Sequence, residues 1–251
     1  PPPPPPLFFL FIRLPPLFTL LFSWAASFVF ILLLLFLAGI ITGQNVDFRF
    51  DPDSELQAKK ITSYSSFWLS RTPPVNPNGE KRLLISAGYS ALLKRFGGET
   101  WILPDADIAL KITNNLALSG KIYGFSTAKD QPQVVGAGIQ YFFGNSEKKS
   151  WVFAVQRADI KGLYSFQIKS FTFDIRKWIQ WSILLFRVGV GSNYYKESTY
   201  NTTGLISSVM KGKTNYIAAD AMLDILGITG GLGIKFHPDR TFLSFFILSC
   251  N

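Results

Sequence analysis

Residues 134–143 read VVGAGIQYFF, and this stretch decides how the rest of the chain is interpreted. Val135, Ala137, Ile139, Tyr141 and Phe143 are apolar, whereas the positions between Val135 and Tyr141 carry glycine or glutamine. Successive side chains of a β-strand point to opposite faces, so a period of two predicts a strand with one apolar face and one polar face.

The same alternation recurs from Leu83 almost to the end of the chain. The apolar sets are Ala106, Ile108, Leu110 and Ile112; Leu116, Leu118 and Ile122; Trp151, Phe153 and Val155; Tyr164, Phe166 and Ile168; Phe171, Phe173 and Ile175; Leu184, Phe186, Val188 and Val190; Ile217, Ala219, Ala221 and Leu223; Ile228, Leu232, Ile234 and Phe236. About ten such segments follow one another up to a last apolar strand at Thr241–Leu248, which predicts an all-β meander. The phase slips after Ser170, which predicts a β-bulge there.

Two architectures fit this meander. A soluble sandwich or barrel points its apolar face inward, whereas a transmembrane barrel points it at lipid and keeps a polar lumen. Sparse charge on the polar face favours the membrane barrel, as do the aromatic residues near segment ends: Trp101, Tyr141, Phe142, Phe143, Trp151, Trp178 and Trp181. Unequal connections favour it too, because Asn114-Asn115 and Asp224–Leu226 are tight and Gly191–Lys213 is predicted to be a long polar loop.

Composition supports a membrane setting. Charged residues make up 16% of the 251 residues, against about 25% in an average globular protein, and aromatic residues also make up 16%. The single cysteine, Cys250, excludes a disulfide framework and a cysteine zinc site, and the single histidine, His237, excludes any mechanism that needs two. The net charge of +9 is scattered rather than gathered into a patch, so no nucleic-acid partner is expected.

The first 43 residues carry much of the apolar excess. A run at Phe28–Leu37 followed by small residues up to Gly43 is typical of a secretory signal cleaved before Gln44, and a membrane anchor is the alternative. Residues 44–82 form a polar leader, which we expect to be periplasmic and irregular, with one helical turn around Ser54–Lys60.

Residues 83–249 resemble bacterial outer-membrane β-barrel proteins in the alternating strands, in the glycine-containing strand Val134–Phe143 that ends in Gly144, and in the aromatic borders. The resemblance implies a small antiparallel transmembrane β-barrel of eight to ten strands in residues 83–251, located in the outer membrane. Its partners would be the lipid bilayer and the outer-membrane assembly machinery. One departure is the end of the chain, LSCN, where such barrels usually carry an aromatic residue.

A barrel of this size is filled by side chains, so charges on its inner face must be paired. The expected inward set is Asp105, Asp107, Lys111, Lys121, Gln140, Gln167, Lys169, Asp174, Arg176, Arg187, Asp220, Asp224 and Lys235. Five acidic residues against six basic ones predict an internal ion-pair network. The same residues could instead line a narrow pore for small polar solutes.

The sequence assigns no catalytic, cofactor-binding or metal-binding residue. His237 in a turn, with Ser192, Ser198 and Ser207 on the expected loop, leaves an outer-membrane lipid hydrolase with a rim active site as an alternative. A secreted soluble ligand-binding barrel is the other alternative. The preferred hypothesis is a non-enzymatic outer-membrane barrel with a structural role, an adhesive role through the 191–213 loop, or a narrow-pore role.

Overall fold

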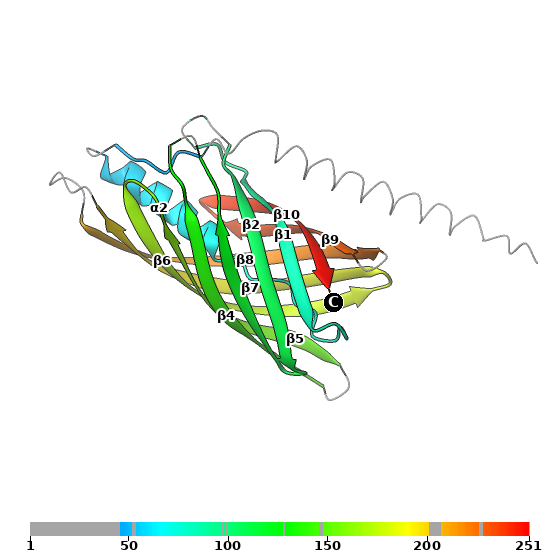
Figure 1. The fold of residues 1–251 in the computed structure, drawn as a ribbon. Coiled ribbons are helices and arrows are strands. Elements are labelled where there is room, and N and C mark those ends of the chain that lie inside the picture. Colours follow the sequence, from blue (N-terminus) through cyan, green and yellow to red (C-terminus); the bar gives the residue numbers. More distant parts are fainter. Residues whose placement is uncertain are drawn as a thin grey trace, which may run out of the picture.

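The computed structural model describes residues 46–51, 54–96, 98, 100–127, 129–145, 148–200, 207–225 and 228–250, so the expected signal segment at 1–43 lies outside the described residues. Within these ranges the chain forms one helix followed by ten strands (Figure 1). No helix in the described ranges is both long and apolar enough to cross a membrane.

The strands form one closed antiparallel barrel in which each pairs with its neighbours in sequence and β1 pairs with β10. The elements are α2 Glu55–Leu69, β1 Leu83–Leu92, β2 Ile102–Thr113, β3 Leu116–Gly124, β4 Gln133–Gly144, β5 Lys149–Lys161, β6 Phe166–Trp181, β7 Leu184–Thr199, β8 Val209–Ile225, β9 Ile228–His237 and β10 Arg240–Cys250. Ten strands are the upper of the two predicted numbers, and β1 starts at Leu83, where the sequence pattern changes.

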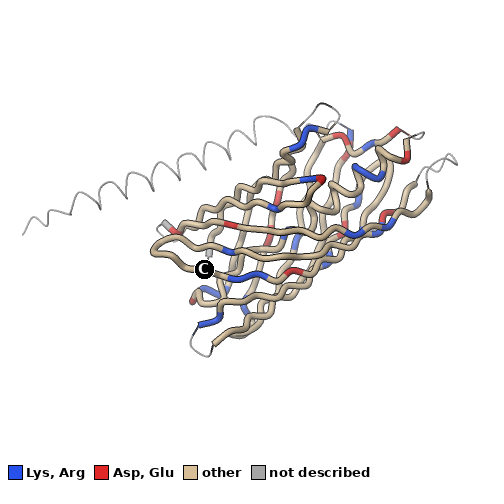
Figure 2. The backbone as a smooth tube through the Cα atoms, turned by 180° about the vertical axis from the view of Figure 1, so that it is seen from behind, with Lys and Arg blue, Asp and Glu red and all other residues tan. Residues whose placement is uncertain are grey.

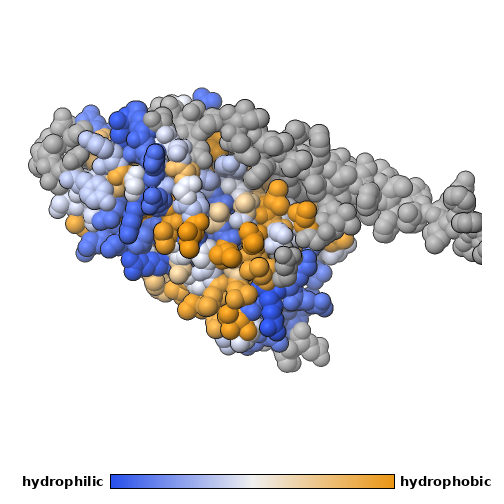
Figure 3. Space-filling model, viewed as in Figure 1, coloured by the Kyte–Doolittle hydropathy of each residue, from blue (hydrophilic) through white to orange (hydrophobic). Residues whose placement is uncertain are grey.

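The apolar face of the wall points outward. Ile122 on β3 is 81% exposed and Ile217 on β8 is 55% exposed, whereas Asp107 and Arg176 point into the lumen and are almost fully buried. Apolar side chains gather over the middle of the visible wall, with hydrophilic ones toward both ends (Figure 3). A soluble barrel would have the opposite sense, so the transmembrane architecture is the one observed.

The two ends of the barrel differ. The links β2–β3, β4–β5, β6–β7 and β8–β9 are two to four residues long and lie where β1 begins, which we call the turn end. The opposite end, which we call the loop end, carries the longer links β1–β2, β3–β4 and β7–β8 together with the shorter β5–β6 and β9–β10 links.

Two strand predictions were wrong. No bulge interrupts β6, which pairs with β5 and β7 in continuous register. Phe166 and Ile168 therefore point inward and Lys169 outward, because the lumen at the loop end is apolar: Phe166 stacks on Phe50 of the leader with ring centroids 5.5 Å apart.

The predicted long loop at Gly191–Lys213 is mostly strand. β7 continues to Thr199 and β8 starts at Val209, because the polar residues in this stretch alternate between the lumen and the outside as apolar ones do elsewhere. Asn193 and Glu197 are fully buried, and the link itself covers only residues 200–208.

The aromatic residues near the strand ends divide between the two faces. Tyr141, Trp151 and Trp181 point outward, as expected for an interfacial border. Trp101, Phe142 and Trp178 are buried in the lumen instead. Those three aromatic residues fill the barrel interior and do not belong to a lipid-facing girdle.

Candidate functional site: a leader segment held in the lumen

The leader runs through the inside of the barrel. At the loop end, Phe48 packs against Trp101 with ring centroids 5.5 Å apart. The helix α2 follows in the lumen (Figure 1), and residues 70–82 continue as extended chain to the turn end, where β1 begins. Residues 46–82 therefore occupy the lumen, which the sequence did not predict, and outside α2 the described part of this segment is irregular, as expected.

The helix is fifteen residues long rather than the single turn expected around Ser54–Lys60. Ser54 caps it by accepting a hydrogen bond from the Gln57 amide (3.4 Å). Inside the helix, the Thr62 and Ser65 hydroxyls donate to carbonyl oxygens four residues earlier. These bonds allow a polar helix to be buried on most sides, and burial on most sides leaves no 3.6-residue period to detect.

Side chains of the barrel wall bind the carbonyl oxygens at the end of this helix. Lys235 Nζ donates to the Phe67 oxygen at 2.6 Å, Asn193 Nδ2 to the Ser66 oxygen at 2.9 Å, and Gln156 Nε2 to the Leu69 oxygen at 3.0 Å. The last carbonyls of a helix lack partners within the helix and form its negative end. The Lys235 ammonium therefore compensates both the missing bonds and the charge.

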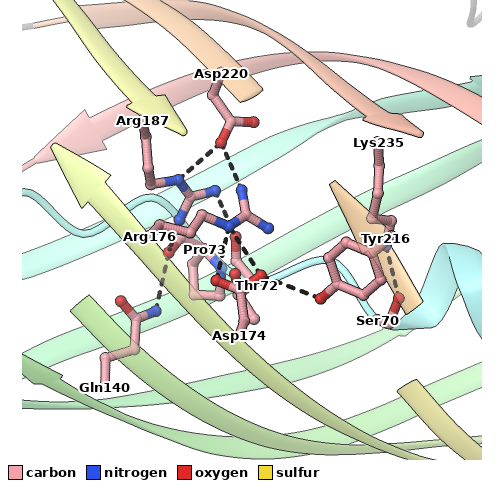
Figure 4. Close-up of polar contacts among 10 residues, drawn as sticks. All are labelled: Ser70, Thr72, Pro73, Gln140, Asp174, Arg176, Arg187, Tyr216, Asp220 and Lys235. Carbon is pink, nitrogen blue, oxygen red and sulfur yellow. Dashed lines mark hydrogen bonds and ion pairs between the residues drawn. The ribbon is translucent and has the colours of Figure 1, made fainter. Parts of the chain in front are cut away.

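The extended segment is held in the same way. Pro73 O accepts from Arg187 Nη1 at 3.0 Å and from Gln140 Nε2 at 2.9 Å, and Thr72 O accepts from Arg187 Nη2 at 3.1 Å (Figure 4). Toward the turn end, Lys111 Nζ donates to the carbonyl oxygens of Pro77 and Gly79 at 3.0 and 2.7 Å. Pro73 and Pro77 have no amide hydrogen and cannot donate to a sheet ladder. The carbonyl oxygens of this segment accept hydrogen bonds from wall side chains instead.

A buried ion network supports the two arginines of the wall. Arg176 Nε lies 2.7 Å from Asp174 Oδ1, and Arg176 Nη1 lies 2.7 Å from Asp220 Oδ2. The same Asp220 oxygen accepts from Arg187 Nε at 2.8 Å, and the Tyr216 hydroxyl donates to Asp174 at 3.1 Å (Figure 4). The network fixes the Arg187 guanidinium so that its outer nitrogens face the leader.

Two further ion pairs lie in the lumen. Lys121 Nζ is 2.5 Å from Asp107 Oδ1, and both side chains are almost fully buried. Arg71 of the leader has its Nη1 atom 3.3 Å from Asp105 Oδ2, and the same carboxylate accepts from the Ser90 hydroxyl. Removal of one member of such a pair leaves a buried charge without compensation, which is strongly destabilising.

The structure buries ten of the thirteen predicted inward residues: Asp105, Asp107, Lys111, Lys121, Gln140, Asp174, Arg176, Arg187, Asp220 and Lys235. Gln167 is half-buried, and Lys169 and Asp224 are exposed. The prediction missed Gln156 and Asn193, although the alternation that identified the others also places these two inward. It missed Arg71 as well, since nothing in the leader's sequence shows that it lies inside the barrel.

Three of the four residues considered for hydrolysis, His237, Ser192 and Ser207, are engaged in other contacts. His237 Nδ1 accepts from the Asp239 amide at 3.2 Å and lies 3.8 Å from the Asp239 carboxylate. Ser192 donates to Asn215 Oδ1 at 2.5 Å, and Ser207 donates to the Val209 oxygen at 2.9 Å. In the described part of the chain, no group of three or more His, Cys, Asp or Glu side chains could hold a metal ion.

The closed wall, the outward apolar face and the polar filled lumen together define a transmembrane β-barrel of the outer-membrane type. The protein is therefore an outer-membrane protein whose wall contacts the lipid bilayer.

No protein-family model and no curated protein matches the sequence. Among solved structures, the chain is similar to the outer membrane protein Ail of Yersinia pestis in a phospholipid bilayer nanodisc, with 10% identity, a TM-score of 0.35, and coverage of 68% of this chain and 100% of Ail. It is also similar to the translocator domain of the autotransporter NalP from Neisseria meningitidis, with 10% identity, a TM-score of 0.38, and coverage of 76% and 92%. Because these identities and TM-scores are low, we assign the protein to the class of outer-membrane barrels from its own closed wall, outward apolar face and polar lumen.

Proposed function

We propose that the protein is a sealed, non-catalytic structural barrel of the outer membrane. The observation that carries this proposal is the leader, whose carbonyl oxygens from Ser66 to Gly79 are bound by wall side chains along the lumen. We expect a segment held at so many points, in a lumen otherwise filled by buried side chains, to leave no continuous path for solutes. Among the structural, adhesive and narrow-pore roles, this arrangement supports the first two over the third.

Planar bilayer recordings test the seal. We expect the intact protein to give no steady ion conductance, whereas the double variant R187A/Q140A, which removes both donors to Pro73 O, should show intermittent opening. The matched control is R157A, since Arg157 lies on the outer face and bonds to neighbouring Asp159. Folding of each variant is checked by heat-modifiable gel migration. Steady conductance by the intact protein would contradict the proposal.

Absence of catalysis is tested separately at His237. We expect no hydrolysis of lipid esters by the intact protein, and the H237A variant should give the same baseline. Ester hydrolysis that disappears in H237A would replace the structural role with a rim hydrolase.

A basic cavity at the loop end favours adhesion as a second candidate function. The cavity has a volume of about 790 Å³ and lies between the start of α2 and the β1–β2 and β7–β8 links. Its basic residues are Lys59, Lys60, Lys94, Arg95, Lys211 and Arg240, against the acidic residues Glu55 and Asp239. Such an excess of positive charge suits an anionic polymer of the cell exterior.

Retention on an immobilised sulfated polysaccharide tests this adhesive role. We expect the intact protein to elute at higher salt than the variant K94A/R95A, because screening by salt weakens exposed charge pairs. The control variant K148A/K149A removes two lysines near the turn end and should elute with the intact protein. Equal elution of all three proteins would argue against adhesion through this cavity.

A further inference from the structure

Three lysines lie side by side on the outer face of the wall near the loop end. In the strand register, Lys169 of β6 is opposite Lys196 of β7, which is opposite Lys211 of β8. Like charges directly opposite one another in a sheet are destabilising. The three lysines therefore lower the stability of the fold locally unless an anion from outside the chain compensates their charge.

The acidic residues around this row do not neutralise it. Asp159 lies opposite Lys169 in the register, but its carboxylate is engaged by Arg157 at 3.0 Å. Glu197, next to Lys196 in sequence, points to the lumen and is fully buried. Among the described residues, no ion pair within 4.0 Å involves Lys169, Lys196 or Lys211.

The next outward-facing row, further from the loop end, carries a fourth lysine beside an aromatic ring. Lys213 of β8 is opposite Tyr194 of β7, with Nζ 5.2 Å from the ring centroid. The next row is Phe173, Ser192 and Asn215. Figure 2, which shows the barrel from behind, has several basic positions on the strands toward this end.

An apolar groove opens directly below these lysines on the same outer face. Its volume is about 620 Å³, and Lys213, Ser192 and Asn215 line it together with the apolar side chains Phe153, Phe173, Ile175, Val190, Ile217 and Phe236. The groove lies where the pairing of β8 with β9 begins at Ile217, so that the β7–β8 hairpin extends beyond the end of β9 at His237. The end of β9 and the following Pro238 form one side of it.

From this arrangement we infer that the outer face of β6–β8 is a binding site for a phosphate-bearing membrane lipid. The order of residues along the strands is a lysine row, then a lysine with a tyrosine, then small polar residues, then an apolar groove. A lipid in the leaflet on the loop side presents the same order, from phosphate through the ester or amide region to acyl chain. Lys169, Lys196, Lys211 and Lys213 bind the phosphate, and the groove holds part of a chain.

Charge and position select this occupant over a protein partner. The groove lies within the lipid-facing apolar wall, where an acyl chain is already present at high concentration. The lysines lie at its border with the charged loop end, where interfacial cations meet head groups.

Native mass spectrometry of the detergent-solubilised full chain, titrated with phosphatidic acid, tests the site. We expect saturable retention of the lipid by the intact protein and at least tenfold weaker retention by the triple variant K169Q/K196Q/K211Q. The matched control is K81Q/K148Q/K177Q, which removes three exposed lysines near the turn end and should retain the lipid as the intact protein does. Diacylglycerol with the same chains, which lacks the phosphate, should not be retained.

A second measurement keeps the proposal falsifiable if lysine replacement alters folding. Without lipid, K169Q/K196Q/K211Q should unfold at a temperature equal to or above that of the intact protein, because repulsion is removed. With phosphatidic acid, only the intact protein should gain thermal stability. Equal retention by the intact protein and the triple variant would overturn the proposal, as would inorganic phosphate binding as tightly as the lipid.

Discussion

The Arg187 guanidinium, on strand β7, donates from Nη1 to the carbonyl oxygen of Pro73 at 3.0 Å. The two residues are 114 positions apart in sequence. Arg187 belongs to the buried ion network of the wall, and Pro73 belongs to the leader that fills the lumen. This bond therefore joins the barrel wall to the leader inside it, and several expectations follow from this bond and its neighbours.

The variant R187A should lower the stability of the folded barrel by about 3 kcal/mol or more, because it removes two bonds to the leader and one partner of Asp220. Asp220 keeps Arg176 as its remaining partner. Unfolding in denaturant, followed by circular dichroism, measures the change. R157A on the outer face should leave the transition unchanged, and an unchanged transition in R187A would show that the bond to Pro73 is dispensable.

Phe67 anchors the helix α2 in the lumen. Its side chain is fully buried and lies against Tyr216 and Phe242, with ring centroids 5.6 and 5.9 Å away. F67A should cost about 3–5 kcal/mol of stability, the usual range for a large aromatic residue removed from a packed core. On the same helix, Leu56 is 67% exposed, so L56A should have little effect. Similar losses in both variants would contradict the role of Phe67 as a packing anchor.

The buried Lys121–Asp107 pair should show a large coupling energy. K121M leaves the Asp107 carboxylate buried without its cation, at a cost of about 3–5 kcal/mol. The double variant K121M/D107L removes both charges and should recover most of that loss. A double-mutant cycle measured by chemical denaturation gives the coupling, and strictly additive losses would contradict the pair's role.

Gly88 lies where β1 closes on β10. A Cβ atom at this position would overlap the carbonyl oxygen of Phe245 and come within 2.8 Å of the Phe246 Cα atom. G88A should therefore reduce the fraction of protein that refolds to the heat-modifiable barrel form. G120A is the control, because the nearest atom to its Cβ would be the Ile108 Cγ2 atom at 3.4 Å. Normal refolding of G88A would indicate that the pairing of β1 with β10 can shift to accommodate a Cβ atom.

Asp47 connects the leader to the β3–β4 link through a 2.8 Å ion pair with Lys129. Burial raises the pKa of this carboxyl, but the hydrogen bonds from Lys129 and the Arg49 amide outweigh burial, so the pKa is lowered from 3.8. A lowered pKa stabilises the fold at higher pH, and this contribution is lost as the pH falls below about 3.8 through the folded-state value.

The melting temperature of the intact protein should therefore exceed that of D47N at neutral pH, and the difference should shrink in acid. K129M should lose much of the same pH dependence, because it removes the stronger partner of Asp47. A difference between the intact protein and D47N that stayed constant below pH 3.8 would contradict the contribution of this ion pair.

The sequence by itself determined the wall. Each strand alternates between lipid and lumen, so the apolar positions could be read directly, and most polar residues opposite them were assigned correctly to the interior. Lys121 and Arg176 are examples. A period of two is a local property of a strand, and local properties are visible in the chain without knowledge of its neighbours.

Only the tertiary structure decided what fills the lumen. The helix α2 is polar on most sides, and its burial depends on Asn193 and Lys235, which lie more than a hundred residues away. Phe166 was assigned to lipid because it is apolar, yet it faces inward, since Phe50 of the leader makes that part of the lumen apolar. A polar helix or an inward phenylalanine becomes favourable only when distant strands supply its partners, and a one-dimensional pattern does not carry that information.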